Sequence, residues 1–274
     1  MPVIMVSSLT QTGCETTFKA LELGAIDFVA KPQASYSSSL EDVMAELVTK
    51  VKGAARIRMR NKPFVENQPP VVAPQKPVSN SAMIKTTHKI VAIGASTGGT
   101  EALKDVLVKM PPDSPPIIIV QHMPEVFTKA FAERLDSLCS VEVREAKNGD
   151  SAIPGVALIA PGNYHLTLTR DGARYIVETN RQPQVNHHRP SVEMLFDSVA
   201  HYAGSNAIGV IMTGMGADGA TGLLNMKNAG AKTIAQDEES CVVFGMPKEA
   251  IKLGAVDKVV SLDRIPETIL SFLN

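Results

Sequence analysis

Three residue types that together can cleave an ester each follow a predicted strand. Ser96 lies in the turn 94–99, between an apolar strand and a helix. His122 follows a second apolar strand, and Asp218 lies in the glycine-rich turn 213–219 after a third. In serine hydrolases a histidine accepts the serine proton while a carboxylate orients that histidine. Because the carboxyl ends of parallel strands meet at one crevice, we expect these three residues to lie together.

Each of these residues also has an ordinary structural interpretation. Asp218, which precedes Gly219, could be a helix N-cap; His122 could be a hydrogen-bonded loop residue; and Ser96 could be only the cap of the following helix. Their occurrence after three strands, rather than any one of them alone, favours catalysis. Backbone N–H groups in the two glycine-rich turns could then bind the developing oxyanion.

Two phosphate-binding motifs resemble the turn at Ser96 in part. A P-loop requires Lys and then Ser or Thr after its last glycine, whereas Gly99 is followed by Thr100-Glu101. A dinucleotide-binding turn requires glycine where Ser96 stands and an acidic residue about 20 positions later, but the next strand ends in Gln121-His122. The P-loop is excluded, and dinucleotide binding stays a minor alternative.

The chain from residue 88 onwards alternates between apolar strands and amphipathic helices. A paired stretch, 165–169 and 175–178, flanks the turn signal 170–172 and predicts a β-hairpin. We therefore predict an α/β fold: a doubly wound, mostly parallel sheet with an inserted hairpin. Its strands are expected at 89–93, 116–121, 207–212 and 232–235, and its helices at 100–109, 125–138, 219–228 and near 247 and 266.

The N-terminal part of the chain has a different organisation. A strand at 2–6, a helix at 17–23 and a strand at 26–30 predict one strand-helix-strand unit, which we expect to be poorly ordered or to lean on the rest of the molecule. An amphipathic helix is expected at 40–59, and the proline-rich stretch 61–87 is typical of a linker.

Composition excludes several classes of protein. With 44% apolar residues, 20% charged residues and a net charge of −1, the chain does not resemble a nucleic-acid-binding protein. Its apolar runs are too short to cross a membrane, and no signal peptide is recognisable. The three separated cysteines favour the reducing cytoplasm, and the histidine spacing predicts neither a metal site nor another cofactor.

The chain contains the motifs Gly94-Ala-Ser-Thr-Gly-Gly-Thr100, Gln121-His-Met-Pro124, Ile159-Ala-Pro-Gly162, His188-Arg-Pro-Ser191, Thr213-Gly-Met-Gly-Ala-Asp-Gly219 and Phe244-Gly-Met-Pro247. Together these motifs resemble the chemotaxis protein-glutamate methylesterase family, CheB. Residues 1–34 similarly resemble the end of the response-regulator receiver domain that precedes the esterase in this family, including Met5-Val-Ser-Ser8 and Ala30-Lys-Pro32.

The resemblance implies roles for individual residues. Ser96 would be the nucleophile, His122 the general base and acid, and Asp218 the orienting carboxylate. Thr97 and Met215 would border the site, with the Met215 amide in the oxyanion hole. The substrates would be glutamate γ-methyl esters of methyl-accepting chemotaxis receptors and, for some members, receptor glutamines.

The same resemblance implies a domain organisation. Residues 1–35 would be the end of a receiver domain, 36–87 a connecting helix and linker, and 88–274 the catalytic domain. Ser7 would occupy the receiver's hydroxyl switch position and Lys31 the phosphate-contacting position. Because the phosphoacceptor aspartate is absent from the sequence, we expect neither phosphorylation control nor contact with a histidine kinase. Removing residues 1–60 is expected to change the rate by only a few-fold.

Two other functions compete with this interpretation. A generic α/β-hydrolase for small esters places its histidine after its acid, whereas no histidine follows Asp218 here. A non-catalytic module that binds receptors would not require all three of the candidate catalytic residues. Receptor choice, deamidation and oligomeric state are not determined by the sequence.

Overall fold

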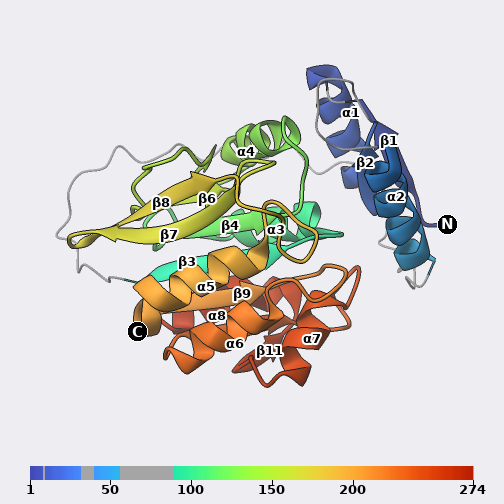
Figure 1. Cartoon of the computed structure of the whole chain (residues 1–274). Helices are drawn as coiled ribbons and strands as arrows, with labels where there is room; N and C mark the ends of the chain where they lie inside the picture. The colour runs from blue at the N-terminus through green and yellow to red at the C-terminus, as the bar shows by residue number, and fades with distance from the viewer. Residues whose placement is uncertain (9, 32–39, 56–88, 274) are drawn as a thin grey trace.

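A seven-stranded parallel sheet forms the centre of the molecule (Figure 1). The computed structural model describes residues 1–8, 10–31, 40–55 and 89–273, so the predicted linker at 61–87 lies outside the described residues. The strand order is β11-β10-β9-β3-β4-β6-β5, and every neighbouring pair is parallel. The predicted doubly wound α/β fold is thereby confirmed.

The strands that precede the three candidate catalytic residues lie side by side at the centre of this sheet. Strand β3 (Ile90–Ala95) pairs with β4 (Ile117–Gln121) on one side and with β9 (Ala207–Ile211) on the other. The outer strands are β5 (Glu142–Glu145), β6 (Val156–Ile159), β10 (Lys232–Gln236) and β11 (Lys258–Val260).

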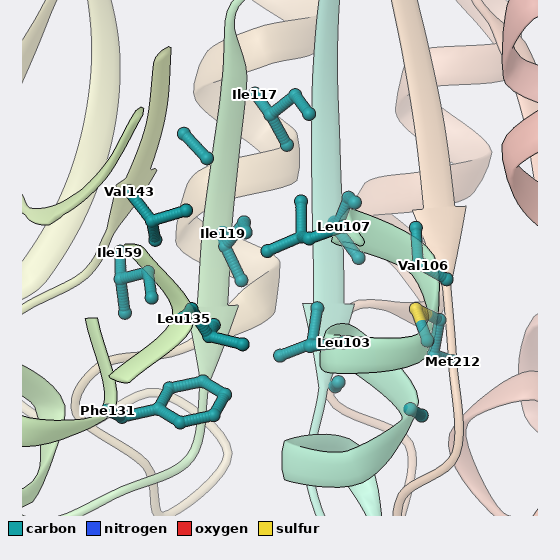
Figure 2. Packing of buried hydrophobic residues seen from close by; sticks show 14 of the residues in the cluster. Leu103, Val106, Leu107, Ile117, Ile119, Phe131, Leu135, Val143, Ile159 and Met212 are labelled. Carbon is teal, nitrogen blue, oxygen red and sulfur yellow. The ribbon is translucent and has the colours of Figure 1, made fainter. Parts of the chain in front are cut away.

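Helices cover both faces of the sheet, as a buried parallel sheet requires. One face packs against α3 (Gly99–Leu107), α4 (Phe127–Leu138) and α8 (Ile265–Ser271). Figure 2 shows part of this core, in which Leu103, Ile119 and Phe131 interdigitate. The other face packs against α5 (Val192–Tyr202), α6 (Ala220–Asn228) and α7 (Met246–Lys252).

The predicted hairpin is present as a separate two-stranded antiparallel sheet. Its strands β7 (His165–Asp171) and β8 (Arg174–Asn180) are joined by a tight turn containing Gly172, whose φ of 61° favours glycine. Leu166, Leu168 and Val177 from the hairpin join the core beneath α5. The hairpin therefore closes one end of the second helical layer.

The N-terminal unit consists of β1 (Ile4–Ser7), α1 (Gln11–Glu22), β2 (Asp27–Ala30) and α2 (Leu40–Ala54), with β1 and β2 parallel. Figure 1 shows this unit on the side of the molecule next to α4, and helix α1 contacts α4. The ring of Phe28 stacks on Phe127 at 4.4 Å and that of Phe18 on Phe131 at 5.7 Å. Burying each ring contributes roughly 1.5–3 kcal/mol, so these contacts with α4 stabilise the packing of the small N-terminal unit.

The predicted and observed elements differ in a few places. Helix α1 begins at Gln11, six residues before the predicted start, because the Thr10 side chain accepts a hydrogen bond from Gly13 N–H and caps the helix. Strands β5, β6 and β11 and helix α5 were not predicted from the sequence. Helix α2 ends at Ala54, Ala55 is in a turn, and residues 56–59 of the predicted helix 40–59 lie outside the described residues.

Candidate active site

Ser96, His122 and Asp218 come together at the carboxyl ends of three adjacent strands. Ser96 directly follows β3, His122 directly follows β4, and Asp218 lies in the loop after β9. The registers Ala95↔Gln121 and Gly94↔Ile211 align the ends of these strands. The prediction that the three residues meet at one edge of the sheet is therefore correct.

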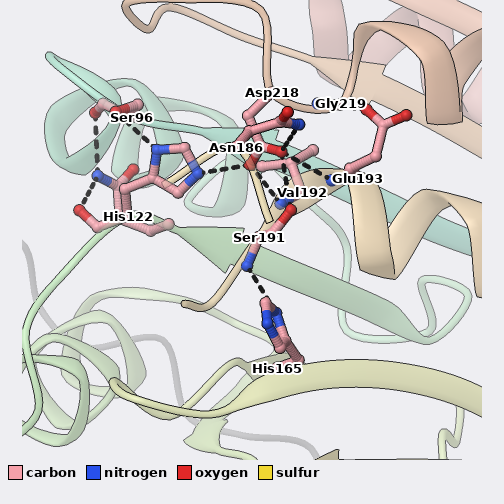
Figure 3. A network of polar contacts seen from close by, with 10 residues as sticks. Ser96, His122, His165, Asn186, Ser191, Val192, Glu193, Asp218 and Gly219 are labelled. Carbon is pink, nitrogen blue, oxygen red and sulfur yellow. Dashed lines mark hydrogen bonds and ion pairs between the residues drawn. The ribbon is translucent and has the colours of Figure 1, made fainter. Parts of the chain in front are cut away.

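The three side chains form a continuous hydrogen-bonded chain (Figure 3). Ser96 Oγ lies 3.1 Å from His122 Nδ1, and His122 Nε2 lies 2.8 Å from Asp218 Oδ2. An ionised carboxylate only accepts hydrogen bonds, so Nε2 carries the proton and Nδ1 accepts from the serine hydroxyl. The two ring nitrogens thus exchange the roles they have in the chymotrypsin arrangement, in which Nε2 faces the serine.

The Asp218 carboxylate is almost completely enclosed by hydrogen-bond donors. The side chain is 1% exposed, and Oδ2 accepts from His122 and from the Val192 amide at 2.7 Å. Oδ1 accepts from Ser191 Oγ at 2.7 Å and from Asn186 Nδ2 at 2.9 Å, with the Glu193 amide at 3.3 Å.

This enclosure determines the ionisation of Asp218. Burial alone would raise the pKa of Asp218, but the hydrogen bond and charge of His122 and the hydrogen bonds from Asn186 and Ser191 outweigh it. They hold the pKa of Asp218 well below its ordinary value. The carboxylate is therefore an anion wherever the protein is folded near neutral pH.

Ser96 stands in a tight turn that leads into α3. Its N–H donates to Thr213 O at 3.0 Å, and its carbonyl accepts from Gly99 N–H at 2.7 Å and from Gln121 Nε2 at 2.9 Å. Gly98 adopts a φ of 78°, and a Cβ there would collide with Val242, so only glycine fits. The backbone of Ser96 is thus fixed from three directions while its hydroxyl faces His122.

The loop that contains Met215 lies directly beside Ser96. A Cβ on Gly214 would sit 2.8 Å from the Ser96 Cβ. Thr213 fixes this loop: its N–H donates to Gln236 Oε1 at 2.8 Å and its hydroxyl to Thr97 O at 2.9 Å. Within the described part of the chain, neither the Thr97 nor the Met215 amide N–H donates a hydrogen bond, so both are available to a ligand.

Two predicted receiver residues lie elsewhere, at the ends of β1 and β2. Ser7 Oγ donates to Gly13 O at 3.1 Å, and the Lys31 amide donates to Ser7 O at 2.7 Å, while the Lys31 side chain is exposed. Among the described residues, no hydrogen bond or ion pair connects either of them to the site at Ser96.

The N-terminal unit nevertheless reaches the edge of the site. Gly53 of α2 packs so closely against Met215 that a Cβ at position 53 would collide with the methionine methyl group. Lys50, one turn earlier, is held by Asp27 at 3.2 Å and by Phe28 O at 2.6 Å. Helix α2 therefore borders the loop that carries one candidate oxyanion donor.

Two residues around Asp218, Asn186 and Glu193, were not predicted from the sequence, and Ser191 was named only as the end of the motif His188-Arg-Pro-Ser191. Asn186, Ser191 and Glu193 come from one segment, residues 185–193, which the sequence analysis assigned to no element. The ring of His188, from the same segment, lies parallel to that of His122, with centroids 3.7 Å apart and an interplanar angle of 15°. A signal existed: Ser191 precedes apolar residues at helical spacing, namely Val192, Leu195, Phe196 and Val199.

The described residues hold neither a membrane-spanning helix nor a metal-binding cluster. None of the helices is both long enough and apolar enough to cross a bilayer. Within the ranges that the structure describes, no group of three or more His, Cys, Asp or Glu residues is arranged to hold a metal ion.

Comparison with known proteins assigns this arrangement to a family. The model of the family described as CheB methylesterase matches residues 91–269, which contain β3, β4, β9 and all three residues of the hydrogen-bonded chain. The chain belongs to the CheB methylesterase family. The family model therefore starts at the first strand of the seven-stranded sheet and ends within its last helix.

Individual relatives agree with this assignment. The protein-glutamate methylesterase/protein-glutamine glutaminase 2 of Syntrophus aciditrophicus is 56% identical over 98% of this chain and 77% of its own length. The corresponding protein 3 of Burkholderia lata is 52% identical over 100% of this chain and 76% of its own length. The crystal structure of the Thermotoga maritima CheB methylesterase catalytic domain aligns with a TM-score of 0.66 and 42% identity, covering 67% of this chain and 97% of that chain.

Proposed function

We propose that this protein hydrolyses glutamate γ-methyl esters on the cytoplasmic helices of methyl-accepting chemotaxis receptors. The observation that carries the proposal is the hydrogen-bonded chain from Ser96 through His122 to Asp218. It lies at the carboxyl ends of the central strands, in the part of the chain that the CheB methylesterase family model matches. The relatives named as protein-glutamate methylesterases support the choice of substrate. Residues 88–274 would be the catalytic domain, 36–87 the connecting segment, and 1–35 the end of a receiver domain.

In this scheme His122 transfers one proton in each direction. As Ser96 Oγ attacks the ester carbonyl carbon, Nδ1 of His122 takes the hydroxyl proton, and the carbonyl oxygen becomes an oxyanion. Collapse of the tetrahedral intermediate breaks the bond to the methoxy oxygen, which takes the proton from Nδ1 and leaves as methanol. Water then attacks the acyl-serine by the same route, and glutamate and free Ser96 are released.

The charges that develop during these steps have matching partners in the site. Asp218 stabilises the positive charge on His122, and its five donors keep it ionised while it does so. The free amides of Thr97 and Met215 would bind the oxyanion, since the first follows the nucleophile and the second lies on the loop against Ser96. The scheme uses no metal ion or organic cofactor.

The same site would deamidate receptor glutamines. Attack on an amide carbonyl gives the same acyl-serine, but the leaving nitrogen must receive a proton before it departs as ammonia. His122 Nδ1 is placed to give that proton because it lies beside the Ser96 oxygen that carried it. Relatives named also as protein-glutamine glutaminases support this second activity. Because the receptor helices concerned are cytoplasmic, the enzyme would work in the cytoplasm, with the receptors as its partners.

Methanol release from a methylated receptor fragment tests the proposal. The wild-type chain should release methanol, and Ser96→Ala should lower the rate by about 10⁴-fold or more without lowering the melting temperature, because a turn hydroxyl contributes little packing. Thr16→Ala, which removes an exposed hydroxyl from α1, is the matched control and should retain the wild-type rate. Turnover of Ser96→Ala within tenfold of wild type would exclude Ser96 as the nucleophile.

A further inference from the structure

The segment 185–193 contacts both His122 and Asp218, although the proposed reaction assigns the segment no role. We propose that Asn186 and His188 are positioning residues of the active site: Asn186 fixes the Asp218 carboxylate, and His188 fixes the His122 ring by stacking on it. This inference rests on the proposed function, because it concerns the geometry of the same reaction. It gives a role to the motif His188-Arg-Pro-Ser191, which the triad itself does not use.

The stacking of His188 restricts the movement of His122. The rings lie at 3.7 Å and 15°, a nearly parallel contact over one face of the catalytic imidazole. His122 must hold two hydrogen bonds at once, at 3.1 Å to Ser96 and 2.8 Å to Asp218. Rotation about either side-chain torsion would break one of these bonds and drive the ring against His188. The stacked ring therefore favours the one orientation that bridges serine and carboxylate.

The protonation state of His188 also suits a ring stacked on His122. Burial, followed by the charge of His122, lowers the pKa of His188 to about 3, with His187 and Lys50 acting in the same direction and Asp218 against them. His188 is therefore neutral at the pH of the reaction and presents a π face to His122. When His122 becomes an imidazolium, a neutral ring attracts it whereas a second cation would repel it.

Asn186 acts on the other partner. Its Nδ2 donates to Asp218 Oδ1 at 2.9 Å, on the oxygen that does not face His122. Asn186 has a φ of 52° and His187 a φ of 65°, so two successive residues are left-handed, a conformation that asparagine tolerates better than most residues. Hydrogen bonds from Val185 N–H to His188 O and from His188 N–H to Val185 O close the turn.

The turn is anchored independently of the catalytic residues. The Arg189 guanidinium donates to Asn163 Oδ1 at 2.7 and 3.2 Å, and it also donates to the carbonyls of Arg181 and Gln182. This clamp joins the segment to the loop after β6. The positions of Asn186 and His188 are therefore set by a rigid frame, as a positioning role requires.

Steady-state methanol release by the full chain tests the role of His188. His188→Ala should lower kcat by ~10–100-fold while KM stays within about threefold, because the reacting geometry is lost and substrate binding is not. His188→Phe should recover most of that loss, since a flat apolar ring can still stack. A kcat for His188→Ala within threefold of wild type, or a His188→Phe variant that folds yet is no better than His188→Ala, would overturn the proposal.

A second pair of variants tests Asn186. Asn186→Gly, which keeps the left-handed backbone and removes the donor, should lower kcat by ~10-fold. Asn186→Asp should move the acid limb of the kcat/KM profile to higher pH, because a second negative charge beside the His122–Asp218 pair favours the protonated, inactive form of that pair. His187→Gly, in the same turn, should behave as wild type. Unchanged kcat in Asn186→Gly and an unmoved acid limb in Asn186→Asp would remove Asn186 from the mechanism.

The failure of this inference can be told apart from that of the proposed function. If only the positioning role is wrong, wild type still releases methanol and Ser96→Ala still does not. If the proposed function is wrong, wild type releases no methanol from a glutamyl methyl ester, whatever residue stands at 186 or 188. Thermal unfolding of each variant shows whether a lost rate comes from a lost fold.

Discussion

At the scale of single residues, Glu193 is a carboxyl group whose surroundings disfavour its ionised form. It lies in the first turn of α5 beside Asp218, and its Oε2 accepts a hydrogen bond from Gly219 N–H at 2.9 Å. Burial, and then the nearby Asp197, raise the pKa of Glu193 from 4.5 to about 7. The folded protein therefore holds this proton more tightly than the unfolded chain does.

The raised pKa of Glu193 predicts a pH-dependent loss of stability. Between about pH 4.5 and 7 the folded state binds more protons at this site than the unfolded state, so the free energy of unfolding falls as pH rises. Glu193→Gln keeps an acceptor for Gly219 and cannot ionise, so its stability should exceed that of wild type at pH 8 and approach it at pH 5. Urea unfolding at both values measures this difference.

The matched control for this prediction is Glu267→Gln, which changes an exposed carboxylate in α8. It should leave the difference in stability between pH 5 and pH 8 unchanged. A Glu193→Gln variant that is less stable than wild type at pH 8 would show that the ionised carboxylate stabilises the fold, contrary to the expectation from burial.

Residues of the site differ in how far the sequence could predict them. Ser96, His122 and Asp218 each directly follow a strand or lie in the loop after one, so the alternation of strands and helices was enough to bring them together. Asn186 could not be found this way, because it lies in an irregular loop whose path depends on the Arg189 clamp. The hydrogen bond from Asn186 to Asp218 spans 32 positions, and no local pattern encodes it.

At the scale of elements, the sequence predicts a strand best where apolar runs are long and glycine marks the end. Strands β3 and β9 were found for this reason, and β4 was found from its run of apolar residues before Gln121-His122. Strand β5 instead reads Glu142-Val-Arg-Glu145, with one buried side chain among charged ones. Its place is decided by pairing with β6 at the sheet edge, which is a tertiary contact. Propensity and periodicity carry no information of that kind.

The packing of β2 on α4 gives a prediction at this scale. Phe28 is 3% exposed and stacks on Phe127 at the start of α4, so Phe28→Ala leaves a cavity between the N-terminal unit and the catalytic sheet. Such a change costs about 3–5 kcal/mol where the cavity cannot collapse. We expect faster trypsin cleavage within residues 1–55, with little change in the melting temperature of the catalytic sheet.

Leu23→Ala serves as the control for Phe28→Ala. Leu23 is 63% exposed, so its truncation removes no buried contact. It should leave the cleavage rate unchanged. Equal protection of residues 1–55 in Phe28→Ala and wild type would show that the aromatic contacts with α4 do not hold the N-terminal unit in place.

At the scale of the whole molecule, the catalytic part and the N-terminal unit share one hydrophobic core. Cys14, Phe18, Leu21 and Phe28 belong to the same cluster as the residues beneath α3 and α4. From the sequence we expected this unit to be poorly ordered or to lean on the rest of the molecule, and in the structure it packs against α4. The sequence could not predict where, because the contact of Gly53 with Met215 joins positions far apart in the chain.

That contact predicts the effect of removing the N-terminal unit. The solved relative of Thermotoga maritima is a catalytic domain alone, so a chain that begins at Thr86 should fold. Because α2 then no longer borders the Met215 loop, we expect methanol release to rise about tenfold, which corresponds to ~1.4 kcal/mol of lost contact. This exceeds the few-fold change expected from the sequence. A rate equal to or below that of the full chain would show that α2 does not restrict the site.

The central claim is that Ser96 is a nucleophile activated by His122 and Asp218. Labelling with a fluorophosphonate, followed by mass spectrometry of the digested chain, tests it most directly, since the reagent adds to the activated serine itself. We predict one adduct, on Ser96, and a labelling rate that falls by roughly 10³–10⁴ in Asp218→Asn, because the amide favours the wrong tautomer of His122. An adduct on another residue, no adduct at all, or an Asp218→Asn variant that reacts at the wild-type rate would contradict the claim.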